Sequence, residues 1–332
     1  MSAVIQFKDL INFQEINNRD LVDRYLDSFG THISPATLDT YRNDIEIFLK
    51  QVSQILNIPL SNKEELILSV NSDVAETWRT IILKNNIYKK KSFNKKLIAL
   101  NGFYNYLCNT KHLIEYNPFE NINKEKILRG DVKEKEILTK EELKQLLDTF
   151  DKVSDNDKMN FTRTRNRFLI ALCNSCGYRI NEALGIQLQD LKENKKLKVV
   201  EINLEGERIK NHLDRHNVIC GKTLVYFRKY MKERKKMQID SELLITTLSN
   251  KKVDYKDINE VIDRKLKSLN INKHITNHCF RHYCSSYLST LTNEATKCSI
   301  LGWKLEGMSS IYTHDTEEML KEKIRACSEL II

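Results

Sequence analysis

The residues best suited to chemistry lie together in the stretch NHCFRHYCSSYL, residues 277–288. His278 and Arg281 are three positions apart, so a helix would carry both side chains on one face. A guanidinium offers a planar fork of donors to a phosphate, and an imidazole exchanges a proton near neutral pH. The pair is therefore compatible with a phosphate-binding site, although the same stretch could instead be a metal site, a thiol nucleophile or a patch of helix surface.

Metal and thiol sites are the alternatives for this stretch. His278 and His282 have a metal-compatible spacing, but a zinc-binding HExxH motif needs a glutamate where Cys279 stands. Cys279 and Cys284 fall on different faces of one helix, which is typical of cysteines that pack against neighbours. The sequence therefore favours neither metal nor thiol chemistry here.

A CxxC pair, Cys173 and Cys176, lies inside the apolar run FLIALCNSCGYRI. Neither a second cysteine pair nor a nearby histidine pair completes a zinc site. Small thiols are common in buried helices, so we expect both to pack in a core, with the cysteines of the chain reduced.

Arg179 lies on this otherwise apolar run, near its end, and Glu182 stands three residues further on. A buried arginine needs a partner. The two residues form either a structural ion pair or an arginine that a carboxylate holds toward a phosphate. Further along, ILGWKLEGMSSIYTH places Tyr312 nine residues after Trp303.

The chain of 332 residues is basic, with a formal net charge of +9. Such a balance favours a polyanionic partner, most often nucleic acid. Five lysines gather near the start of one expected helix: Lys89, Lys90, Lys91, Lys95 and Lys96. They form either a solvated face or contacts to the phosphates of a DNA duplex.

Few glycines and prolines interrupt the chain, which predicts a mainly helical fold. Helices are expected within residues 17–29, 34–56, 73–84 and 85–114. Ser34 suits an N-cap and Pro35 a first helical position. Residues 124–138 are charged and lack an apolar stripe, so we expect a linker there and domains 1–131 and 132–332.

The second domain is expected to be mostly helical as well. Thr139 opens a helix, with Glu142 placed to complete a capping box. Residues 196–221 alternate and predict a β-hairpin or three-stranded antiparallel sheet, and helices follow at 222–236, 256–269 and over the opening stretch. The sequence shows no secretory signal and no apolar run long enough for a membrane span, so we expect a soluble intracellular protein.

Taken in order, these motifs resemble the catalytic signature of the tyrosine recombinases, also called phage integrases. That pattern is roughly G-L-R-x-S-E, a hairpin lysine, H-x-L-R-H, L-G-H/W and a final tyrosine. The matching residues are Arg179, Glu182, His278, Arg281, Trp303 and Tyr312. Tyr178, Asn181 and Phe280 replace the usual Leu, Ser and Leu, and most members have His in place of Trp303.

The resemblance also implies a catalytic lysine on the hairpin. Arg215 in DRHNVI resembles the arginine that follows the family's turn, and counting back from it assigns Lys210. This hairpin lacks the usual Lys-Gly turn, and Lys196 and Lys198 are the alternatives.

The resemblance covers most of the chain. It implies a helical, SAM-like core-binding domain that closes with the second domain around DNA, and a mostly helical catalytic domain with a small antiparallel sheet. The implied reaction is phosphoryl transfer from DNA to Tyr312 and back to another strand, without a metal or other cofactor. In this reaction Arg179 and Arg281 bind the phosphate oxygens. His278 donates a hydrogen bond or accepts the Tyr312 proton, and Trp303 offers an N–H. Lys210 protonates the leaving 5′ oxygen, and Glu182 and His282 have supporting roles.

The implied function is site-specific recombination, for integration or excision of a mobile element or for dimer resolution. The alternatives are a type IB-like topoisomerase and a catalytically silent DNA-binding regulator. The implied partners are a duplex recombination site, a homotetramer assembled on it from free monomers or dimers, and an accessory DNA-bending or directionality factor. A cytoplasmic, nucleoid-associated location with no membrane contact follows. The amphipathic tail, residues 317–332, packs either on a neighbouring protomer or on its own domain.

Overall fold

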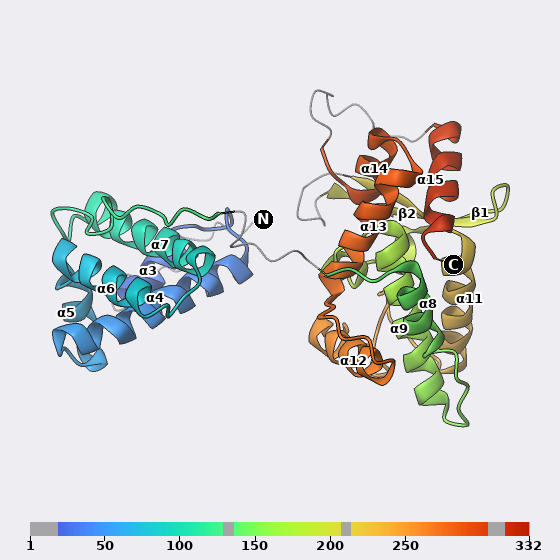
Figure 1. The fold of residues 1–332 in the computed structure, drawn as a ribbon, viewed down its shortest axis with the longest axis horizontal. Helices are drawn as coiled ribbons and strands as arrows, with labels where there is room; N and C mark the ends of the chain where they lie inside the picture. The colour runs from blue at the N-terminus through green and yellow to red at the C-terminus, as the bar shows by residue number, and fades with distance from the viewer. Residues whose placement is uncertain (1–18, 129–135, 207–213, 305–315, 332) are drawn as a thin grey trace, which may run out of the picture. The chain divides into compact units, whose positions relative to one another are not determined.

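The computed structural model describes residues 19–128, 136–206, 214–304 and 316–331, which fall into two compact units (Figure 1). The units are Met1–Lys133 and Glu134–Ile332, and each has its own hydrophobic core. The predicted boundary between residues 131 and 132 lies outside the described residues. Within the described ranges, no helix has both the length and the apolar character needed to cross a bilayer.

The first unit is helical throughout its regular structure. Its α-helices are α3 (Leu21–Asp27), α4 (Pro35–Leu56), α5 (Lys63–Leu68), α6 (Ser72–Lys84) and α7 (Lys90–Asn105), with a 3-10 turn at Leu60–Asn62 and a π-helical turn at Tyr106–Thr110. The predicted start of α4 is confirmed, because the Ser34 hydroxyl accepts the Thr37 backbone N–H at 3.3 Å and Pro35 is the first helical residue. The short helix α5 was not predicted, since six residues carry too little periodicity to detect.

Aromatic side chains fill the centre of this unit. Phe48 and Trp78 meet edge to face with centroids 5.3 Å apart, and Phe119 contacts both rings. The buried indole of Trp78 donates its N–H to Gln51 Oε1 at 2.8 Å, so the ring is buried without an unsatisfied donor.

The second unit surrounds one long buried helix. Its α-helices are α8 (Lys140–Asp148), α9 (Asp157–Cys176), α10 (Ile180–Ala183), α11 (Gly221–Lys236), α12 (Tyr255–Ser268), α13 (Asn277–Leu291), α14 (Glu294–Leu301) and α15 (Glu317–Glu329). The predicted capping box of α8 is present, with Thr139 and Glu142 as its partners. α11 and α13 both pack against α9 (Figure 1), which explains why the second half of α9 is buried on every side.

A three-stranded antiparallel sheet, with a 3-10 turn at Leu188–Asp190 before it, completes this unit. The strands are β1 (Leu191–Asn194), β2 (Val199–Leu204) and β3 (Arg215–Ile219), and Leu204 pairs with Arg215. The predicted antiparallel sheet is confirmed, but the predicted stretch contains only β2 and β3, because β1 lies entirely before residue 196. Its central residues Lys192 and Glu193 are exposed, so the strand has no apolar alternation to recognise.

The C-terminal helix α15 packs on its own unit, against α11, α14 and β3. Leu320, Ala326 and Cys327 are buried there. The tail was predicted to pack either on a neighbouring protomer or on its own domain. In this single chain, its described residues pack on their own domain.

Gly177 ends α9 and turns the chain toward α10. Its φ of 60° lies in the left-handed region, which glycine adopts without steric penalty. A Cβ atom at this position would come within 2.5 Å of Leu301 Cδ2. Only glycine therefore lets the ends of α9 and α14 come this close.

Gly177→Ala is expected to destabilise the second unit by more than about 1 kcal/mol. Left-handed strain alone accounts for about that much, and Leu301 must also move away. Gly30→Ala is the matched control, since Gly30 has a φ of 52° and nothing within 4 Å of the added Cβ. Hydrogen exchange with mass spectrometry measures the two units separately. Equal losses of protection in the two variants would mean that the contact with Leu301 contributes nothing.

Candidate functional site

Arg179 lies between α9 and α10, where the chain turns. The sequence placed it on an apolar helical run, but the helix ends at Gly177 and Arg179 is the N-cap of α10. Its Nη1 donates to Glu182 Oε1 at 2.6 Å, and its backbone N–H donates to Glu182 Oε2 at 2.9 Å. Its side chain is 30% exposed, so Glu182 holds a guanidinium that solvent or a ligand reaches.

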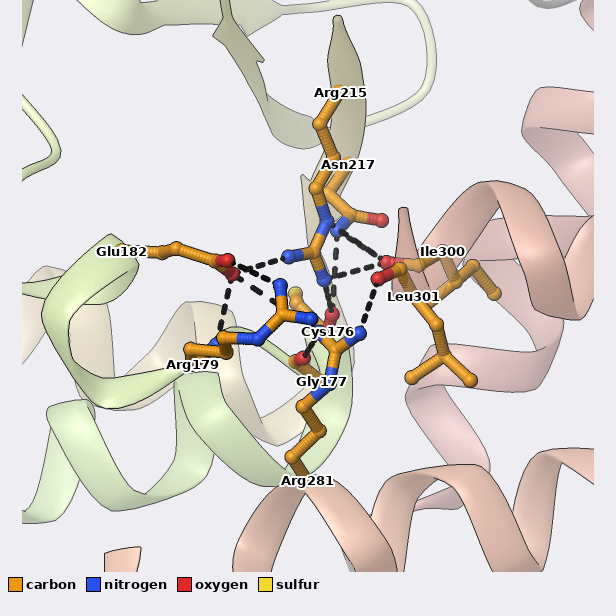
Figure 2. A network of polar contacts seen from close by, with 9 residues as sticks. All are labelled: Cys176, Gly177, Arg179, Glu182, Arg215, Asn217, Arg281, Ile300 and Leu301. Atoms are coloured by element: carbon orange, nitrogen blue, oxygen red, sulfur yellow. Dashed lines mark hydrogen bonds and ion pairs between the residues drawn. The ribbon is translucent and has the colours of Figure 1, made fainter. Parts of the chain in front are cut away.

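Arg215, the first residue of β3, reaches this turn from the upper side of the network in Figure 2. Its Nη1 donates to Glu182 Oε2 at 2.9 Å, and its Nη2 donates to the carbonyls of Cys176 and Ile300 at 2.5 and 2.6 Å. The guanidinium also lies 4.0 Å from the centre of the Tyr178 ring. Arg215 is 2% exposed, so it acts as an internal connector of three chain segments.

Arg281 on α13 reaches the same place from the other side of the network (Figure 2). Its Nη1 donates to the Gly177 carbonyl at 2.5 Å and its Nη2 to the Leu301 carbonyl at 2.7 Å. A guanidinium has five N–H donors, so donors remain after these two contacts. Burial, and then the charges of Arg215 and Arg179, lower the pKa of Arg281 to about 10, which leaves it protonated at neutral pH.

The carbonyls that receive these donors belong to two helix ends. Cys176 and Gly177 end α9, while Ile300 and Leu301 end α14. The last carbonyls of a helix have no partner within it and carry the negative end of its dipole. Arg215 and Arg281 satisfy both requirements, and the Asn217 amide adds a bond to Ile300 O at 2.9 Å.

Glu182 is the carboxylate of this network. Burial alone would raise its pKa, but attraction to Arg215 and the hydrogen bonds from Arg179 outweigh burial and lower the pKa below its usual value. Glu182 lies 2.9 Å from Arg215 and 4.0 Å from Arg281. Among the residues drawn in Figure 2, three guanidiniums thus share one carboxylate, and the centre keeps a net positive charge.

His278, His282 and Trp303 lie on the elements that flank Arg281. The two imidazoles of α13 meet edge to face with centroids 4.7 Å apart. The Trp303 ring is 5.7 Å from the Arg281 guanidinium and 5.6 Å from the Lys297 amine, and it is 38% exposed. The structure therefore brings Arg179, Glu182 and Arg281 together, with His278 on the same helix as Arg281 and Trp303 against it.

Lys210 and Tyr312 fall outside the described residues. Lys210 belongs to the connection between β2 and β3, residues 205–214, in which it is the one lysine of the sequence. The alternatives Lys196 and Lys198 belong to the other connection of the sheet, between β1 and β2, and Lys196 pairs with Glu317 at 3.1 Å.

The cysteines of the candidate motifs are structural. Cys173, Cys176 and Cys284 are fully buried, and burial raises the pKa of the Cys173 and Cys284 thiols. Cys279 has a capping role, because its sulfur accepts the Thr276 N–H at 3.4 Å. Across the described ranges, no three histidine, cysteine or acidic side chains group as metal ligands do.

The lysines predicted to contact DNA separate into two kinds in the first unit. Lys89, Lys91 and Lys95 are exposed and Lys90 is half-buried. Lys96 differs from the prediction, because it is buried with its amine bonded to Asp44 Oδ1 at 2.5 Å. An amine in a buried ion pair is not available to a phosphate, so Lys96 has a structural role.

Sequence reasoning missed the roles of Arg215, Asn217 and Lys323. Arg215 and Asn217 alternate with Ile219 on one face of β3, and all three are buried. The sequence does carry a signal for this, because polar residues that alternate with a buried apolar position of a strand lie on the same buried face. Lys323 of α15 is also buried, and its amine donates to the carbonyl of His216 at 2.8 Å, next to Arg215.

Glu182→Gln is expected to lower the free energy of unfolding of the second unit by about 3–5 kcal/mol at pH 7, because it leaves buried arginines without their carboxylate. Glu182 has a lowered pKa in the folded state, so its contribution is complete above the unfolded-state value and is lost as the pH falls through the folded-state value. The gap between variant and wild type in urea unfolding should therefore shrink below about pH 4.5. Glu193→Gln, an exposed change on β1, is the control; a gap that persists unchanged in acid would contradict this role.

Comparison with known proteins places the chain in a family. The profile of the phage integrase family matches residues 136–319, more than half of the chain. The chain is 25% identical to a tyrosine recombinase XerC of Caldanaerobacter subterraneus subsp. tengcongensis over 96% of this chain and 90% of that protein. It is 26% identical to an integrase of Staphylococcus phage L54a over 89% and 87%.

Solved structures share the fold. XerH site-specific recombinase bound to a palindromic difH substrate aligns with a TM-score of 0.60 at 18% identity, covering 91% of this chain and 93% of that one. A lambda integrase dimer bound to a COC′ core site aligns with a TM-score of 0.62 at 13% identity, covering 89% and 97%. This chain belongs to the phage integrase family.

Proposed function

We propose that this protein is a site-specific DNA recombinase that cleaves and rejoins strands through a 3′-phosphotyrosyl intermediate on Tyr312. The observation that carries the proposal is the network in which Arg179 and Arg281 converge with Arg215 around Glu182. Family membership and the named activity of the relatives support the same reaction.

The charge of the network suits a phosphodiester. The transition state of phosphoryl transfer carries more charge on the non-bridging oxygens than the ground state does, so fixed cations stabilise it preferentially. Arg179 is held by Glu182, and Arg281 is held by two carbonyls, so neither has to reorganise when the substrate binds. A guanidinium also contacts two phosphate oxygens at once, which a lysine does not.

The proposed step exchanges one phosphate ester for another. The Tyr312 oxygen attacks phosphorus, the tyrosyl ester forms, and the bond to the 5′ oxygen breaks. His278 accepts the phenolic proton or donates to the phosphate, Trp303 offers its indole N–H, and Lys210 supplies the proton that the leaving 5′ oxygen needs. A free 5′ hydroxyl reverses these transfers on another strand, so rejoining consumes no nucleotide cofactor.

The assembly proposed for this reaction is a homotetramer on duplex DNA, formed from free monomers or dimers. Support comes from a lambda integrase tetramer bound to a Holliday junction, which aligns with a TM-score of 0.60 and covers 90% of this chain and 78% of that one. The biological outcome is integration or excision of a mobile element or resolution of dimers, since relatives named integrase and XerC both match. An accessory DNA-bending or directionality factor and a place on the nucleoid belong to the same proposal.

In the first unit, the proposal assigns phosphate contacts to Lys89, Lys90, Lys91 and Lys95 and leaves out Lys96. The double change Lys91→Ala with Lys95→Ala is expected to reduce the slope of log affinity against log salt by about 1.8, because each lysine–phosphate contact contributes about 0.9. Duplex binding measured across a salt series reports this slope. An unchanged slope would show that these lysines are merely solvated.

Lys96→Met gives the contrasting result. It is expected to leave the salt slope unchanged and to destabilise the first unit by about 3–5 kcal/mol, because Asp44 stays buried without its cation. A reduced slope in a fully stable Lys96→Met protein would restore Lys96 to the DNA contacts.

The function is tested with a nicked suicide substrate taken from the DNA that flanks the coding sequence. Wild-type protein is expected to form a covalent adduct that survives a denaturing gel, without metal or ATP, and Tyr312→Phe should form none. An adduct that persists in Tyr312→Phe would exclude this nucleophile. Duplex binding with no adduct in either protein would favour the silent DNA-binding regulator.

A further inference from the structure

A second concentration of positive charge lies in the second unit, at the start of α9. A cavity of about 360 Å³ opens there between α9, α12 and Phe150. Its charged lining residues are Arg163 of α9 and Arg264 and Lys265 of α12, and no carboxylate of the described residues lines it. Its volume lies within the range of small-ligand sites.

Neutral groups hold two of these cations, Lys265 and Arg163, in place. The Lys265 amine donates to the Thr149 carbonyl at 3.4 Å and lies 5.4 Å from the centre of the Phe150 ring. Arg163 donates to the Lys152 carbonyl at 2.8 Å. Carbonyls and a ring orient a cation without cancelling its charge, so the cavity keeps its positive potential.

The pKa of Lys265 reports the same imbalance. Burial, and then the charges of Arg163, Lys152 and Arg264, lower it below the usual value. Like charges that stay together without an acid are stabilised when an anion binds between them.

A neighbouring cavity provides an internal contrast. It shares Phe150 and Arg163 with the first cavity and is also basic, but Asp151 lines it. Asp151 pairs with Arg167 and lies 3.3 Å from the Lys229 amine. The chain itself therefore partly neutralises the cations of this neighbouring cavity. The first cavity lacks such an acid.

We propose that the cavity bounded by Arg163, Arg264 and Lys265 is a phosphate-binding site separate from the catalytic centre. Arg163 and Cys176 are 13 positions apart on α9, which corresponds to about 20 Å along the helix axis. A phosphate held here therefore does not touch Arg179 or Arg281. The phosphate comes either from the backbone of a bound duplex or from a free phosphorylated compound.

Met159 lines the cavity and makes the site observable. In the full-length protein labelled with ¹³C-methyl methionine, the Met159 signal is assigned through Met159→Leu. Inorganic phosphate, added against chloride at constant ionic strength, is expected to move this signal in a saturable way. Arg264→Ala combined with Lys265→Gln should weaken the phosphate affinity read from this signal about tenfold or more, which corresponds to about 1.4 kcal/mol, because two charge-assisted hydrogen bonds are lost.

Further variants test whether the Met159 response depends on the cations of this cavity. Lys235→Ala removes an exposed cation of α11 that does not line the cavity, and its response should equal that of wild type. If the double variant folds poorly, Arg264→Ala alone replaces it, since Arg264 is exposed. Tyr312→Phe should keep the Met159 response, so failure of the proposed strand cleavage and failure of this site are distinguished.

A random 20-base-pair duplex identifies the source of the phosphate. If it moves the Met159 signal, and the double variant lowers the salt slope of duplex binding by about 0.9 or more, the phosphate belongs to DNA. If inorganic phosphate moves the signal and the duplex does not, the site binds a free phosphorylated compound. The proposal is overturned if neither probe gives a saturable shift, or if the double variant responds as wild type does.

Discussion

The carbonyl groups at the ends of α9 and α14 need hydrogen-bond donors, and two buried arginines supply them. Arg215 bonds to Cys176 and Ile300, and Arg281 bonds to Gly177 and Leu301. Each arginine therefore joins one helix end to the other. Because a helix C-terminus also carries partial negative charge, it offsets part of the cost of burying the two cations. The ends of α9 and α14, the strand β3 and the helix α13 are held in one arrangement by these bonds.

The same arrangement prepares the centre for an anion. Glu182 neutralises at most one of three guanidiniums, and the helix ends contribute only partial charges. Burial and cationic neighbours lower the pKa of Arg281 to about 10. Keeping Arg281 protonated there therefore reduces the stability of the fold. A bound phosphate relieves that repulsion. Under the proposed function, the side chains that stabilise the fold also stabilise the phosphoryl transition state.

Local signals in the sequence predicted the helices well, because caps and apolar periodicity depend on neighbouring residues. Ser34, Pro35, Thr139 and Glu142 all act where the pattern indicated. The Arg179–Glu182 pair was predicted from its spacing, but the contacts of Arg215 and Arg281 could not be predicted in this way. Most of the acceptors in these contacts are backbone carbonyls, which have no residue type, and they lie far from Arg215 along the chain. Lys96 was misassigned for a different reason: its charge was counted, although Phe93, Leu97 and Leu100 place it on the buried face of α7.

α9 connects the two positive regions of the second unit, with Arg163 near its start and the arginine network at its end. Its buried second half makes it a rigid spacer of about 20 Å between them. Phosphates of one DNA strand are spaced by about 3.4 Å along the duplex axis, so this length corresponds to roughly six nucleotides. A single phosphate ion does not span this distance, so it occupies only one of the two regions. Joint occupancy by one ligand therefore requires anionic groups about 20 Å apart, a spacing that the backbone of a duplex provides.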